Sequence, residues 1–250
     1  MKQTRLQRLN VVAWGAFALT MSGSAHASEP AWGWSLNGQR YSEPAMQLTG
    51  VGLGLRYTRQ PPALAPWTIA IDADVARLRY SSDTTGDMAG KTGWDTRWQL
   101  LRDMGAWGPL PFQAGLSLRT SWNDLRGTTS TQNQGYVREN LGLWASFRWR
   151  QPAVAQDRGL QYIRYNLDVL LAGQQRSYLS QVSTARQDVT NRQTQGISFG
   201  IQGRWRLNAH DLEPYIHYSW IGKSNTVSDG MSLVTEPRNE RWQLGIIFWH

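Results

Sequence analysis

The chain has 250 residues and a formal net charge of +8, from 26 Lys and Arg residues against 18 Asp and Glu residues. It contains no cysteine, which excludes a disulfide framework and a cysteine-ligated metal. The mean hydropathy is -0.50, and no run of about 18 apolar residues follows the N-terminal segment, which excludes a helical membrane protein. A transmembrane β-barrel remains compatible with this composition, because only every second residue of its strands faces lipid.

The first 27 residues have the three parts of a secretory signal peptide. Lys2, Arg5 and Arg8 supply positive charge, the apolar stretch VVAWGAFALTM follows, and small residues stand at Ala25 and Ala27. The apolar part is too short to span a bilayer, so the alternative to a signal peptide is a buried N-terminal helix. We expect cleavage after Ala27, which leaves residues 28–250 as one domain with a net charge of +5.

Apolar and polar residues alternate with a period of two along most of this domain, as in half-buried strands. The alternation predicts ten antiparallel strands in an up-and-down barrel, with eight or twelve as alternatives because the first strand is weak and residues 173–195 could hold another pair. An even number places both ends of the domain on one side. The expected strands lie near residues 31–40, 46–59, 66–80, 92–103, 111–124, 136–149, 161–173, 194–207, 212–223 and 239–249.

The breaks between these strands alternate in kind. Long polar breaks such as SSDTTGDMAGKTG and RGTTSTQNQG alternate with shorter or proline-containing ones such as NAHD and QPPALAP. Long loops at one end of a barrel and short turns at the other are typical of outer-membrane barrels, in which the short turns are periplasmic.

Aromatic residues recur near the ends of the predicted strands. Two aromatic belts are expected on the lipid-facing surface, and Phe112 and Trp122 are ten residues apart, roughly 25 Å along the membrane normal for a tilted strand. A soluble barrel or sandwich, with its apolar face inward, is the alternative. The expected belts comprise Tyr57, Trp67, Phe112, Trp149, Tyr165, Trp205 and Phe248 on the short-turn side, and Tyr80, Trp94, Trp122, Trp220 and Trp242 on the long-loop side.

Residues 28–250 resemble the small, single-chain outer-membrane β-barrel proteins of Gram-negative bacteria as a class. Such proteins end on a strand with apolar residues at alternate positions and a terminal aromatic, and Trp242, Leu244, Ile246 and Phe248 fit this pattern, although Trp249 and His250 extend beyond it. The resemblance implies a monomer in the bacterial outer membrane, with its closing strand against lipid and its surface in contact with outer-membrane lipids and lipopolysaccharide. Outer arginines such as Arg176, Arg186 and Arg192 are candidates for contact with lipopolysaccharide phosphates.

The cationic residues after position 27 are 21 arginines and two lysines. Alternation directs more arginines than carboxylates into the lumen, which favours a narrow, porin-like channel for small anionic solutes. The alternative is a plugged structural barrel, filled by an Arg–Asp network, whose long loops bind ligands or surfaces. The glycines of GVGLGL are interpreted as room for lumenal arginines. The expected lumenal residues are Arg56, Asp72, Asp74, Asp95, Arg97, Arg119, Arg138, Arg148, Arg150, Arg164, Asp168, Arg204, Arg206 and Arg241.

Two enzyme hypotheses are weaker. His217 and Ser219 resemble the His-x-Ser pair of outer-membrane lipid A deacylases, but they are expected in the lumen, whereas in those enzymes the pair faces lipid. Asp72 and Asp74 resemble one carboxylate pair of the ten-stranded omptin proteases, but Tyr215 stands where the second pair needs an aspartate. We therefore expect no catalytic activity, no cofactor, no metal and no nucleic-acid partner.

Overall fold

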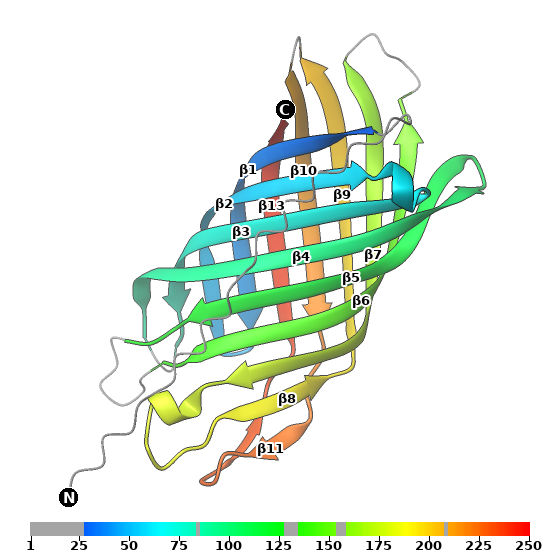
Figure 1. Ribbon diagram of the computed structural model, residues 1–250. Helices are drawn as coiled ribbons and strands as arrows, with labels where there is room; N and C mark the ends of the chain where they lie inside the picture. The colour runs from blue at the N-terminus through cyan, green and yellow to red at the C-terminus, as the bar shows by residue number, and fades with distance from the viewer. Residues whose placement is uncertain (1–27, 84–85, 128–134, 154–158, 208–209) are drawn as a thin grey trace, which may run out of the picture.

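The computed structural model describes residues 28–83, 86–127, 135–153, 159–207 and 210–250. The predicted signal peptide lies outside these residues. Ten antiparallel strands form a closed barrel, because neighbouring strands pair in sequence order and β1 also pairs with β13 (Figure 1). The barrel strands are β1 (Ser28–Glu43), β2 (Met46–Gln60), β3 (Trp67–Ser81), β4 (Met88–Trp107), β5 (Leu110–Asp124), β6 (Val137–Pro152), β7 (Leu160–Ser177), β9 (Gly196–Leu207), β10 (His210–Ile221) and β13 (Asn239–Trp249).

This architecture confirms the predicted all-β, up-and-down barrel and its strand number of ten. Closure pairs every barrel strand on both sides, which leaves no unpaired edge in the ring. Among the described residues, no helix combines the length and apolar character needed to cross a membrane.

The exterior of the barrel is apolar because alternate residues of each strand point outward. On β2, Val51, Leu53 and Leu55 are 65%, 59% and 62% exposed, whereas Arg56 is buried inside. A monomeric soluble protein rarely exposes so continuous an apolar surface, while a barrel in lipid requires one. The closing strand β13 follows the same pattern, with Trp242 and Leu244 exposed outside.

Residues 173–195 do not add a pair to the ring. The short strand β8 (Val189–Gln193) pairs with the last five residues of β7, so it lengthens the hairpin between β7 and β9 beyond the barrel wall. A register shift between Leu143 and Trp144 marks a bulge in the β6–β7 ladder. The bulge reverses which residues of β7 point inward, so Asp168 and Gln175 are both buried.

The connections divide between two ends of the barrel. At the loop end, β1 connects to β2, β3 to β4, β5 to β6, β7 to β9 and β10 to β13. At the terminus end, β2 connects to β3, β4 to β5, β6 to β7 and β9 to β10, and the start of β1 and the end of β13 lie there too. Two expectations about length are wrong. The first loop-end connection is only Pro44 and Ala45, and residues 104–107, expected in a break, belong to β4.

The loop between β10 and β13 is held against its neighbour by a buried carboxylate. Residues 222–238 form a hairpin of β11 (Thr226–Ser228) and β12 (Leu233–Thr235), seen at the lower end of Figure 1. Asp229 Oδ1 accepts backbone hydrogen bonds from Met231 (2.8 Å) and Ser232 (2.7 Å), and Asp229 Oδ2 lies 2.6 Å from Arg186 Nε. The short 3₁₀ helices η1 (Pro62–Leu64) and η3 (Leu179–Gln181) are the remaining elements of the described residues.

Tyr80 is the one belt residue that points the wrong way for lipid contact. It is buried inside the loop end, in an apolar cluster with Leu48, Leu78 and Met88. Tyr80 is thirteen residues from the outward Trp67, so strict alternation on β3 places the two side chains on opposite faces. The expectation that Tyr80 faces lipid is therefore wrong, and the loop end of the lumen is filled by the cluster that contains it.

Candidate functional site

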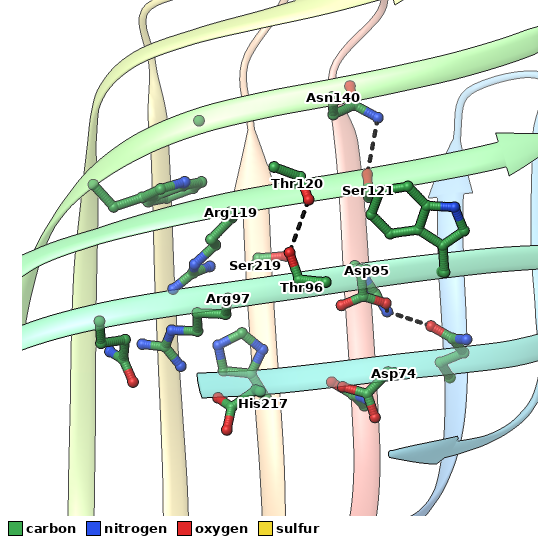
Figure 2. A pocket seen from close by; sticks show the side chains of 18 of the residues that line it. Asp74, Asp95, Thr96, Arg97, Arg119, Thr120, Ser121, Asn140, His217 and Ser219 are labelled. Atoms are coloured by element: carbon green, nitrogen blue, oxygen red, sulfur yellow. Dashed lines mark hydrogen bonds and ion pairs between the residues drawn. The ribbon is translucent and has the colours of Figure 1, made fainter. Parts of the chain in front are cut away.

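The lumen contains a cavity of about 200 Å³ whose wall carries more arginine than carboxylate. Figure 2 shows Arg97 and Arg119 at one side of this pocket and Asp74 and Asp95 at the other. Six arginines and three aspartates line it, namely Arg56, Arg97, Arg119, Arg148, Arg164, Arg241, Asp72, Asp74 and Asp95.

The basic side of the cavity is organised around Asp168 on β7. Arg97 Nη2 lies 2.9 Å from both carboxylate oxygens of Asp168, and Arg119 Nη2 donates to Asp168 Oδ2. Ser146 Oγ is a third donor, 2.6 Å from Asp168 Oδ1, and Asp168 has no exposed surface. The Arg119 guanidinium also lies 4.4 Å from the ring centre of Trp144, a cation–π distance. One buried carboxylate thus holds two arginines at the wall, which leaves a net positive charge there.

The acidic side is formed by β3 and β4. Arg56 Nη2 donates to Asp74 Oδ1 at 2.8 Å, and Asn37 Nδ2 donates to the same oxygen at 2.9 Å. Asp95 Oδ2 accepts from Arg241 Nη2 at 2.6 Å. Asp72 is the more open carboxylate, with 30% of its side chain exposed and 3.6 Å to Arg56 Nε.

Gly54 makes room for the Arg56–Asp74 pair. A Cβ at residue 54 would lie 2.3 Å from Asp74 Oδ1, 2.5 Å from Arg56 Nη1 and 2.6 Å from Ser35 Oγ. No side chain fits in that space, so a glycine is needed where the ion pair crosses the inner face of β2.

Arg148 on β6 differs from the other cavity arginines in having only neutral partners. Its Nη2 donates to Gln99 Oε1 at 3.0 Å and its Nε donates to Asn166 Oδ1 at 3.2 Å. Among the described residues no carboxylate forms an ion pair with it, although it is only 8% exposed. A buried guanidinium without a counter-charge is costly, so Arg148 is the point in the lumen that most needs an anion.

The terminus end of the lumen holds a second buried network that the sequence reasoning missed. Glu213 has no exposed surface, and its two oxygens accept from Arg164 Nη2 and, at 2.8 Å, from Trp249 Nε1. Arg204 lies 5.0 Å from the Trp249 ring and forms an ion pair of 2.8 Å with Asp211. The alternation of LEPYIHYSW gives the signal, because it places Glu213 on the same face as Tyr215 and His217. The last tryptophan therefore turns inward and closes this end.

The loop end holds a third pair, between Arg138 and Glu43. Arg138 Nη1 lies 2.5 Å from Glu43 Oε1, and Tyr41 lies beneath the guanidinium with its ring centre at 5.3 Å. Glu43 was not expected in the lumen because β1 was predicted to end at residue 40. The strand continues to Glu43 before the tight turn, and this length brings the carboxylate to Arg138.

The structure brings most of the predicted lumenal residues together. The nine cavity-lining residues named above all belong to that prediction. Arg138, Asp168 and Arg204 point inward but lie outside the cavity lining, behind it or beyond its ends. Arg206, with 64% of its side chain exposed, lies at the rim beside Asp211, so its expected position in the pore is wrong. Arg150 is likewise exposed at the terminus end, 4.8 Å from the Tyr162 ring.

The catalytic alternatives do not assemble. His217 Nε2 lies 2.7 Å from Ser198 Oγ, so the hydroxyl that contacts the histidine belongs to β9 and not to Ser219. Ser198 has no exposed surface, which prevents attack on a substrate. Asp74 of the proposed carboxylate pair is engaged by Arg56 and Asn37. In the part of the chain that the structure describes, no cluster of His, Asp and Glu could hold a metal ion.

No protein-family model and no curated protein matches the chain by sequence. Its fold is similar to those of solved outer-membrane barrels. The translocator domain of the autotransporter NalP from Neisseria meningitidis is 12% identical over 88% of this chain and 88% of that one, with a TM-score of 0.43.

Two further structures align over nearly their whole length. An outer membrane channel from Pseudomonas putida F1 is 9% identical over 92% of this chain and 99% of that one, with a TM-score of 0.41. Neisserial surface protein A is 11% identical over 89% and 98%, with a TM-score of 0.39. At these scores, the architecture of the chain rests on its own strand pairing and its apolar exterior.

Proposed function

We propose that the protein is an integral barrel of the bacterial outer membrane and that its lumen is a narrow, anion-favouring, non-catalytic pathway for small solutes. The apolar exterior supports the membrane location, because a closed barrel with lipid-facing strands suits that membrane. With the start of β1 and the end of β13 at the terminus end, that end would face the periplasm and the loop end the cell exterior. The remaining predicted belt residues would then lie at the two lipid–water interfaces.

The observation that carries the anion preference is the uncompensated charge of the cavity wall. Six arginines line the cavity with three aspartates, and two buried carboxylates behind the lining, Asp168 and Glu213, pair with three of these arginines, which leaves an excess of one positive charge. Arg148 has only amide partners. Three further donors, Arg97 Nε, Arg119 Nε and Gln243 Nε2, are buried without a protein acceptor. Unsatisfied donors and an excess of positive charge in a low-dielectric wall attract anions and repel cations. The chemistry suited to such a site is that of a small oxyanion or halide.

The packing of both ends makes the pathway narrow. Tyr80 and its apolar neighbours fill the loop end, and Tyr215, Ile247 and Trp249 fill the terminus end. A ten-stranded barrel has an interior about as wide as its own side chains can fill. Passage therefore requires small solutes and movement of a few side chains, and large metabolites are excluded.

Conductance of the refolded protein in a planar bilayer, measured across a salt gradient, tests this proposal. Discrete current steps with a reversal potential toward that of the anion would support it. A stably folded barrel that carries no current, or one that favours cations, would refute it.

The second candidate is a plugged barrel whose loops bind a ligand or a surface, and a specific observation favours it. Arg56, Arg97, Arg119, Arg164 and Arg241 each have a carboxylate partner. The Asp229 clamp also joins the loop of residues 222–238 to that of residues 178–188. A folded barrel that carries no current in the conductance experiment would favour this second function. Binding assays would then move to the loop surface of residues 178–188 and 222–238.

A further inference from the structure

Arginines also occur on the outer face of the barrel, where apolar residues are the rule. Arg40 on β1 and Arg77 and Arg79 on β3 are exposed and lie in outward positions at the loop end. The alternation is clear on β3, where Arg77 and Arg79 lie between the buried residues Ala76, Leu78 and Tyr80. We call these three arginines the outer basic patch.

The strand register places the patch on neighbouring strands. Thr49 on β2 is the register partner of Arg40 on one side and of Arg79 on the other. Arg40 and Arg79 are therefore two strand spacings apart in one row, roughly 10 Å between their backbones. β1, β2 and β3 lie side by side along the barrel wall (Figure 1). Long arginine side chains cover such a distance and can converge on one headgroup.

Most of the positive charge of the patch is not neutralised by the protein. Arg79 has an exposed ion pair of 3.4 Å with Asp87, and Glu240 on β13 lies in an outward position nearby, since its register partner is Ser42. In the described ranges, neither Arg40 nor Arg77 forms an ion pair with a carboxylate. Arg77 also lies over the bare backbone of Gly90, where a Cβ would be 3.4 Å from its Nη2.

The surface beside and below the patch is strongly apolar: Val51 is the register partner of Arg77, and Leu53 and Val75 lie two residues further along their strands. Val51, Leu53 and Val75 are 65%, 59% and 52% exposed on the same face of β2 and β3. An arginine against hydrocarbon costs roughly 2–4 kcal/mol at the bilayer midplane and close to nothing at the interface. The patch must therefore lie at headgroup level, with the apolar residues in the acyl layer.

We propose that the outer basic patch binds the phosphate headgroup of a membrane lipid, whose acyl chains lie over Val51, Leu53 and Val75. Arginine suits this ligand because its guanidinium presents several fixed donors to phosphate oxygens. The lipid is the single occupant that matches both halves of the surface, since the phosphate satisfies the arginines and the chains satisfy the apolar band. The site is independent of the lumen and of the proposed anion pathway.

Native mass spectrometry of the refolded full chain in a neutral detergent tests the site. The probes are diphosphorylated lipid A and neutral phosphatidylcholine, each added to the wild type and to the double variant Arg40→Gln/Arg77→Gln. Two charge-assisted contacts to phosphate are lost in the variant, so we expect its lipid A affinity to fall by tenfold or more. The matched control is Arg102→Gln/Arg150→Gln, which removes two exposed arginines from the terminus end and should bind as the wild type does.

Three results would overturn the proposal. Equal lipid A binding by the patch variant and the wild type would remove the role of these arginines. Equal binding of phosphatidylcholine and lipid A by the wild type would show that acyl chains alone are recognised. Displacement of lipid A by the same concentration of inorganic phosphate would make this a site for the free anion. Circular dichroism of both variants confirms that the barrel is folded, and channel activity plays no part in the readout.

Discussion

Replacing Arg148 with glutamine should lower the anion selectivity of the lumen without unfolding the barrel. The substitution removes the one cavity arginine that has only amide partners, Gln99 and Asn166. A unit charge about 4 Å from a permeating ion contributes about 4 kcal/mol at an effective dielectric constant near 20. Salt and neighbouring carboxylates reduce this value. We therefore expect a loss of at least about 1.4 kcal/mol, a tenfold fall in the ratio of anion to cation permeability.

The effect on stability should be small because two contributions oppose each other. Glutamine loses charged hydrogen bonds worth roughly 1.5–3 kcal/mol each, but it also removes a buried, uncompensated cation. The midpoint of urea unfolding should therefore change little.

Reversal potentials in a planar bilayer under a salt gradient measure the selectivity. Arg206→Gln is the matched control, because the sequence pattern places both arginines in the pore while the structure exposes Arg206 at the rim. We expect selectivity to change in Arg148→Gln and to stay nearly constant in Arg206→Gln. An unchanged reversal potential in Arg148→Gln, or an equal change in both variants, would refute the assignment of the anion site.

Trp249→Ala should open the terminus end of the lumen and raise the single-channel conductance, and it should lower the free energy of unfolding by about 3–5 kcal/mol. The control Phe248→Ala, on the outer face, should leave the conductance unchanged. Equal conductance in the two variants would argue against Trp249 as a plug of the lumen. Backbone donors hold the pKa of Asp229 at about 2, below its ordinary value of 3.8, so this carboxylate stabilises the loop clamp above pH 4 and loses that effect as the pH falls through about 2. The protection of the loop amides, which compares their exchange rate with the intrinsic rate at the same pH, should therefore fall over this range in the wild type and be low at all pH values in Asp229→Asn. Protection that does not change with pH in the wild type would exclude the carboxylate. Gly54→Ala should lower the midpoint temperature of unfolding because the new Cβ would lie 2.3 Å from Asp74 Oδ1 in the ion pair. The control Gly38→Ala should be tolerated, because the nearest atom to its Cβ, the Gly50 carbonyl oxygen, is 4.0 Å away. Equal midpoints in the two variants would contradict the crowding at Gly54.

The sequence by itself determined the barrel. Alternation with a period of two is a local property of the sequence, so it shows which residues of each strand share a face. The outward positions of Trp242 and Leu244 on the closing strand follow from this pattern. Ten strands were predicted and ten are present. One error arose because β1 was ended at residue 40, although the strand continues to Glu43. Another arose at Tyr80, whose aromatic character suggested lipid contact although alternation along β3 places it inward.

Only the tertiary structure decided which lumenal charges neutralise each other. Asp168 binds Arg97 on β4 and Arg119 on β5, 71 and 49 residues away in the chain, and Glu213 joins Arg164 to Trp249. Alternation tells which side chains point inward, but pairing across the lumen depends on the register and shear of the closed ring. In the closed barrel, Arg148 lines the cavity with amide partners only, whereas Arg206 lies at the rim. Alternation predicts that both point inward, but the position of a residue along the barrel axis decides whether its side chain lines the cavity.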